Sequence, residues 1–86
     1  MQLLHYKCIM PTLHKLSNCK IEMRSRDHRP AHVHVVFSDG RDAMVYLAGL
    51  QVVARQRILA SELAPALAWI APRVTQLTFD FEELQK

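Results

Sequence analysis

Apolar and polar residues alternate through the first two thirds of the chain. Ile21 and Met23, for example, stand between charged residues, and a spacing of two is typical of a half-buried strand. This spacing, or a run of β-branched residues, predicts four strands and a shorter one before them: 19–25, 32–37, 41–47, 50–54 and 12–16. Turn signals at Asp39-Gly40 and at Gly49 separate the later strands, so we expect an antiparallel meander.

A different spacing begins near residue 61. Apolar residues now recur at steps of three or four, which places them on one stripe of a helix. The members of this stripe are Leu63, Leu67, Ile70, Val74, Leu77, Phe81 and Leu84. Ser61 is the expected N-cap of a helical region that covers 61–85. Pro72 removes one backbone hydrogen bond inside this region, so we expect a kinked or broken helix.

These patterns predict a single α+β domain over residues 1–86. Its antiparallel sheet should have about four strands, and the long, kinked or broken C-terminal helix should cover one face of that sheet. The apolar stripe of the helix would supply this cover, although a stripe of this kind can also form a coiled-coil seam with a partner. Residues 1–9 form a candidate N-terminal extension of the domain.

Composition narrows the class of protein. Half of the residues are apolar, which suits a packed core rather than a disordered chain. Cys8 and Cys19 form no Cys-x-x-Cys pair and are too few for a disulfide scaffold. The first ten residues lack the apolar run of a signal peptide, and no segment approaches the roughly 20 apolar residues of a membrane span. We therefore expect a cytoplasmic protein without a membrane partner.

Charge is distributed unevenly, although the formal net charge is only +3. Basic residues prevail in the first third of the chain and acidic residues in the last third. A basic region beside an acidic tail indicates an anionic partner for the basic part, and RNA is one such partner. An ordinary solvated surface explains the same distribution equally well.

Three of the five histidines fall in one short segment, Asp27-His28-Arg29-Pro30-Ala31-His32-Val33-His34. On a strand, His32 and His34 point to one face, and the apolar residues next to them point to the core. We therefore expect both histidines on the wetter face of the sheet. His28 precedes the strand and can fold back toward the pair. Tyr46 of the next strand could share their face, either to hydrogen-bond a substrate or merely to pack.

Three interpretations of this segment remain open. In the first, two imidazoles on one strand face hold zinc or another divalent metal, with His28 or Asp27 as the third ligand. In the second, the pair supplies an acid and a base to a phosphate-bearing substrate, because imidazole titrates near neutral pH. Three nearby arginines would then bind the phosphate oxygens: Arg24, Arg26 and Arg29. In the third, the histidines are structural, half-exposed and hydrogen-bonded without a special function.

Two motifs resemble a family of short bacterial proteins. Met10-Pro11-Thr12-Leu13 is similar to the family's opening Met-Pro-Thr-Ile, and the histidine segment resembles its signature Asp-His-x-Pro-Pro-His-Phe-His. The chain is accordingly identified as a member of domain-of-unknown-function family 4160, over roughly residues 10–80. Ala31 and Val33 depart from the signature. Residues 1–9 precede the usual opening, so either Met10 is the natural start or residues 3–9 add an edge strand.

The resemblance implies a biological role. Members are often encoded beside a second small protein, and such pairs have been proposed as toxin–antitoxin modules in which this family is the toxin. We therefore expect a toxin-like protein with a cognate antitoxin-like partner, which acts on RNA or another phosphate-bearing target as a small ribonuclease-like hydrolase. His32 and His34 would be the acid–base groups, His28 would assist, and Asp27 would orient an imidazole.

No cofactor is expected for this reaction. One alternative is a protein that binds zinc or another divalent metal through His28, His32 and His34. Another is a non-catalytic module that binds a protein partner.

Overall fold

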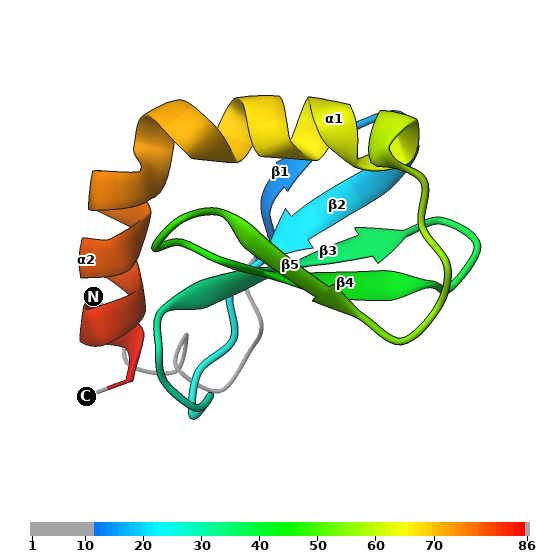
Figure 1. Cartoon of the computed structure of the whole chain (residues 1–86). Coiled ribbons are helices and arrows are strands. Elements are labelled where there is room, and N and C mark those ends of the chain that lie inside the picture. Colours follow the sequence, from blue (N-terminus) through cyan, green and yellow to red (C-terminus); the bar gives the residue numbers. More distant parts are fainter. Residues whose placement is uncertain (1–11, 86) are drawn as a thin grey trace.

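The computed structural model describes residues 12–85, and its centre is an open sheet of five antiparallel strands. In chain order these are β1 (Thr12–Lys15), β2 (Cys19–Glu22), β3 (His32–Phe37), β4 (Asp42–Tyr46) and β5 (Gln51–Ala54). Each strand pairs with the next along the chain, which confirms the predicted meander (Figure 1). The α+β class is also confirmed, but the sheet has five strands rather than about four, because β1 is a full member. The predictions for residues 1–9 lie outside the described residues.

The C-terminal third forms two helices joined by a tight turn. Helix α1 covers Ala60–Ile70, the 3-10 turn η2 covers Ala71–Arg73, and α2 covers Val74–Leu84. Pro72 lies in the turn, where its missing N–H interrupts the helical ladder as predicted. Figure 1 shows α1 running along the sheet and α2 turning sharply away from the direction of α1. Among residues 12–85, no helix has the length and apolar character needed to cross a bilayer.

The start of α1 differs from the prediction, since Leu59 rather than Ser61 takes the N-cap position. Glu62 explains the shift. Its Oε1 accepts a hydrogen bond from the backbone N–H of Leu59 at 2.9 Å, which satisfies a group that a serine cap would have left free. The Glu62 carboxylate also binds Arg41, with Oε2 lying 2.6 Å from Nη2.

The core lies between the sheet and the two helices. The strands bury alternate residues against it, and Val33, Val35 and Val45 are completely inaccessible to solvent. The buried helical residues that meet them come from the predicted stripe and one alanine: Leu63, Ala66, Ile70, Leu77 and Phe81. The other members of the stripe pack against the same core, so the stripe covers the sheet as expected.

Cross-strand pairing also places a row of four side chains on the sheet face opposite the core. Neighbours in the row oppose one another on successive strands, in the order Glu22, His34, Met44 and Val53. Because side chains alternate along a strand, the opposed pair of His32 and Tyr46 lies on this same face. The candidate site lies here.

Candidate functional site

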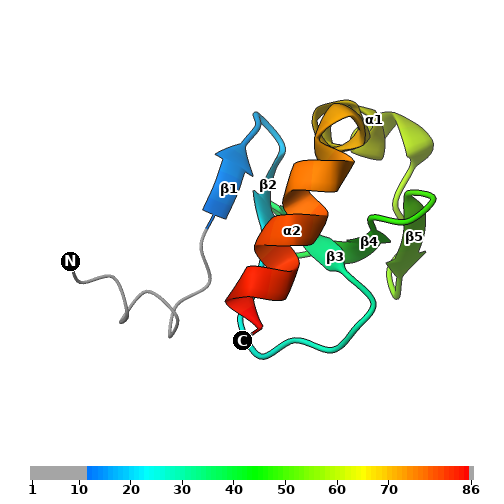
Figure 2. The same cartoon turned by 90° about the vertical axis from the view of Figure 1, so that its left-hand side faces the viewer.

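The segment between β2 and β3 folds back over this face and carries Asp27 above β3. Met23, which is only 1% exposed, anchors the start of the segment in the core. Arg26 then adopts a left-handed conformation with φ of 58°, which turns the chain sharply. Figure 2 shows the segment passing beside the C-terminal end of α2. The segment thereby brings a carboxylate to the two strand histidines.

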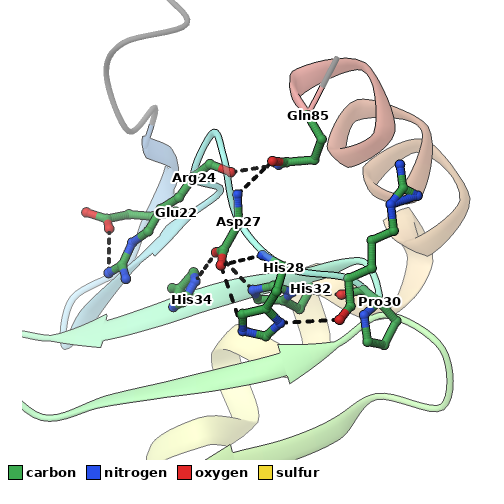
Figure 3. A network of polar contacts seen from close by, with 9 residues as sticks. Glu22, Arg24, Asp27, His28, Pro30, His32, His34 and Gln85 are labelled. Atoms are coloured by element: carbon green, nitrogen blue, oxygen red, sulfur yellow. Dashed lines mark hydrogen bonds and ion pairs between the residues drawn. The ribbon is translucent and has the colours of Figure 1, made fainter.

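Asp27 is the centre of the cluster. Its Oδ2 accepts hydrogen bonds from Nε2 of His32 at 2.9 Å and from Nε2 of His34 at 2.8 Å (Figure 3). Its Oδ1 accepts a hydrogen bond from the backbone N–H of His28 at 2.9 Å. The three bonds fix the orientation of the carboxylate, so the orienting role predicted for Asp27 is compatible with the geometry.

His32 is buried as deeply as any core residue. Its exposed fraction is 0%, and its Nδ1 lies 2.8 Å from the carbonyl oxygen of Pro30. A carbonyl only accepts, so Nδ1 donates this bond, and the ring is held by oxygen acceptors at both nitrogens. Phe81 and Tyr46 enclose it, with ring centroids 5.3 and 5.5 Å away. A substrate therefore has no direct access to His32 in this structure.

The prediction that the histidine face is wetter is wrong at these two positions. His34 is only 7% exposed, although it lies on the face opposite the core as expected. The loop that carries Asp27 covers the strand there, and α2 closes over His32 through Phe81. His28 differs from both, because its side chain remains 59% exposed while one face of its ring stacks on His32 at 4.7 Å.

The end of α2 holds the Asp27 loop in place. The side chain of Gln85 accepts a hydrogen bond from the Asp27 backbone N–H at 2.7 Å and donates one to the Arg24 carbonyl at 2.8 Å. Arg29 adds an ion pair with Glu82, at 2.7 Å. Sequence reasoning missed Gln85, because nothing in a C-terminal glutamine indicates that it will bind a loop about sixty residues earlier in the chain.

An open groove of about 420 Å³ borders the cluster. The residues that line this groove include Arg24, His28, His34, Met44, Val53 and Arg55. Of the three cluster residues that Oδ2 connects, only His34 lines the groove. Its Nδ1 has no hydrogen-bond partner within residues 12–85 and is not sealed from solvent. His34 is therefore the cluster residue that a ligand in the groove would meet.

The predicted phosphate-binding residues separate in space. Arg24 lines the groove, whereas Arg29 lies along α2 in its ion pair with Glu82. Arg26 is exposed and lines neither the groove nor the surface beside Arg29 and α2. Tyr46 lies beside His32, outside the groove lining. The structure instead adds Arg55, just after β5, which sequence reasoning did not select.

Burial and hydrogen bonding shift the pKa values of two cluster residues. The pKa of His34 lies below its usual value, because burial disfavours the imidazolium and Arg24 repels it, while the hydrogen bond to Asp27 acts in the opposite direction. Burial by itself would raise the pKa of Asp27. Hydrogen bonds from His34 and from the His28 backbone, together with the interaction with His32, outweigh burial and leave that pKa below its usual value. At neutral pH the groove thus meets a neutral His34 backed by a carboxylate.

Acid should destabilise the fold through these two residues. Both pKa values are lower in the folded chain, so the unfolded chain binds more protons as the pH falls, and stability decreases. The contribution of His34 to the free energy of unfolding is lost as the pH drops through about 6.5, and the contribution of Asp27 is lost below about pH 4. We expect the thermal midpoint to fall between about pH 7.5 and about pH 5.5, and to fall less in His34→Gln. Equal falls in a fluorescence melting assay would contradict this assignment.

Three ligand atoms of the cluster are also close enough to hold a metal ion. One carboxylate oxygen of Asp27 and one ring nitrogen each of His32 and His34 lie within 4.8 Å of one another. Of the two third ligands that the sequence offered, the structure brings Asp27 to the strand histidines, and His28 is not part of this set. The Nδ1 bond of His32 to Pro30 fits this function, since metal-binding histidines usually donate their other N–H to a carbonyl or carboxylate.

Comparison with known proteins finds one family. The model of a family described as a domain of unknown function, DUF4160, matches residues 19–82. This range contains β2 to β5, the histidine segment and most of the helical region. No curated protein and no solved structure gives a match.

Proposed function

The chain belongs to the DUF4160 family, and we propose that it is the toxin-like component of a bacterial toxin–antitoxin pair that acts on RNA or another phosphate-bearing target. One observation carries the chemical part of this proposal. His34 donates to Asp27 from Nε2, and its side chain lines a groove that Arg24 and Arg55 also line. A base held by a carboxylate beside two cations suits reaction at a phosphate.

The role proposed for each residue of the cluster follows from whether it lines the groove. Asp27 holds His34 in the tautomer whose proton is on Nε2, so that Nδ1 carries the lone pair of a general base. The lowered pKa of His34 keeps this base unprotonated at neutral pH. His28 also lines the groove and is exposed enough to give a proton to a leaving group. His32 supports Asp27 from behind.

With RNA as the substrate the reaction balances without a further reactant. Nδ1 of His34 takes the proton of a 2′-hydroxyl, and the 2′-oxygen attacks the adjacent phosphorus. The bond from phosphorus to the 5′-oxygen breaks, and that oxygen takes a proton from a ring nitrogen of His28. The products are a 2′,3′-cyclic phosphate and a free 5′-hydroxyl. Arg24, whose charge acts on His34, offsets the charge that develops on the oxygens of this phosphate, and Arg55 binds a neighbouring phosphate.

A cleavage assay tests this function. Purified protein should cut single-stranded RNA and leave cyclic phosphate ends. A substrate with one 2′-deoxy residue should stay intact at that position, because it lacks the nucleophile. Cutting at the deoxy position would contradict the assigned chemistry, and the absence of any RNA cleavage would remove support for the ribonuclease part of the proposal.

Metal binding is the second candidate function, and the convergence of Asp27, His32 and His34 favours it. Two imidazoles and one carboxylate suit zinc and other divalent transition metals. Protein purified without a histidine tag should then hold about one equivalent of metal. Zinc in large excess should raise the thermal midpoint by about 10 °C in the wild type and not in Asp27→Asn. A metal-free protein whose midpoint ignores zinc would rule this candidate out.

A further inference from the structure

The floor of the groove is a band of side chains that crosses the sheet. His34, Met44 and Val53 oppose one another on β3, β4 and β5, so their side chains lie in line on the open face. Arg24 follows β2 at one end of this band, and Arg55 follows β5 at the other. Neighbouring strands lie about 4.8 Å apart, so β2 and β5 are separated by about 14 Å of sheet.

The two arginines at the ends are available for an anionic ligand. Arg24 makes one long ion pair, from Nη2 to Oε1 of Glu22 at 3.3 Å, and its side chain remains 31% exposed. Arg55 is exposed and forms no ion pair within the same residues. Asp42 is the acidic residue that also lines the groove. The lining therefore carries two cations against one carboxylate.

His28 supplies a flat surface at the groove. One face of its ring stacks on His32 at 4.7 Å with an interplanar angle of 21°, which fixes the ring orientation. Its side chain is nevertheless 59% exposed and lines the groove. Unstacked nucleobases bind aromatic side chains and histidines in this way. Met44 and Val53 add apolar surface beside it.

We propose that this groove binds a short single-stranded segment of nucleic acid, with phosphates on Arg24 and Arg55 and a base against His28. The proposal rests on the proposed function for its biological sense, and it specifies the substrate of that site as an unpaired strand. A concave site of about 420 Å³ has the size that encloses a small ligand such as a nucleotide. Base stacking requires that the base be free of a paired partner.

Binding measurements with matched arginine variants test this inference. Short fluorescent oligonucleotides of thymidine and of 2′-O-methyluridine resist cleavage through a 2′-hydroxyl, so their anisotropy reports binding alone. Arg55→Gln should weaken binding about tenfold and reduce the slope of log K against log salt by about 0.7, because one phosphate contact is lost. Arg57→Gln is the control, since Arg57 is exposed on the same segment but does not line the groove.

The outcomes separate this inference from the proposed function. If Arg55→Gln weakens binding and Arg57→Gln does not, the groove is the binding site, even if the protein cuts no RNA. If both variants lose affinity equally, binding occurs on a diffuse basic surface and the inference is overturned. The inference is also overturned if the wild type binds a duplex as tightly as a single strand. It is overturned too if the wild type binds no oligonucleotide, and this result does not depend on whether the protein stops bacterial growth.

Discussion

Induction of wild-type protein in a bacterial host should stop growth, and induction of His34→Ala should not. The variant removes the imidazole that lines the groove, together with its bond from Nε2 to Asp27. Loss of a positioned general base typically lowers a reaction rate by about 10²- to 10⁴-fold. The purified variant should therefore cut RNA about 10²- to 10⁴-fold more slowly than the wild type. Growth curves at equal soluble expression are the measurement.

His14→Ala is the matched control for this experiment. His14 lies on β1 and stacks on Trp69 at 4.8 Å, away from the cluster, so its removal should leave growth arrest unchanged. Full toxicity of His34→Ala would show that His34 does not perform the chemistry. If the wild type does not stop growth either, the toxin function loses its support, and the metal site and the binding module remain.

Replacement of His32 by alanine should instead weaken the fold. His32 has no exposed surface, and His32→Ala leaves the Pro30 carbonyl and one bond of Asp27 without their donors. The lost ring also leaves a cavity against Phe81. Removing a buried aromatic ring costs about 3–5 kcal/mol, and the lost hydrogen bonds add to this, so we expect a loss of at least that size. Urea unfolding followed by circular dichroism measures the loss.

His28→Ala is the comparison that isolates burial as the cause. His28 belongs to the same motif and touches the same ring, but its exposed side chain should contribute no more than about 0.5 kcal/mol. Stabilities of His32→Ala and His28→Ala that agree with each other would contradict the structural role given to His32. A loss in His32→Ala alone would assign the structural role to the buried histidine and not to the exposed one.

Alternation along the strands predicted which face each residue of β3 occupies. Val33 and Val35 are in the core, and His32 and His34 are opposite it, because the side-chain period of a strand is fixed by backbone geometry. The same alternation does not say what covers the second face. A loop and a helix end cover it here, so two histidines expected near solvent are buried.

Nearness in sequence predicted the composition of the site only in part. Arg29 lies within the histidine segment, yet its guanidinium pairs with Glu82, which leads it away from the groove. Arg55 and Gln85 are distant in sequence and reach the site through the meander and the turn at Pro72. Such contacts depend on how whole elements pack, and no local pattern of apolar and polar residues encodes that packing.

The bonds of Gln85 give the site an order of assembly during protein synthesis. The ribosome makes the strands and the histidine segment early, and it makes the residue that ties down both Arg24 and Asp27 near the close of the second helix. Chains begin to fold from their N-terminal part while they are being made. A nascent chain therefore carries every group of the cluster before it can hold the loop in place. Activity that depends on this loop would begin only after the last helical turn has left the ribosome.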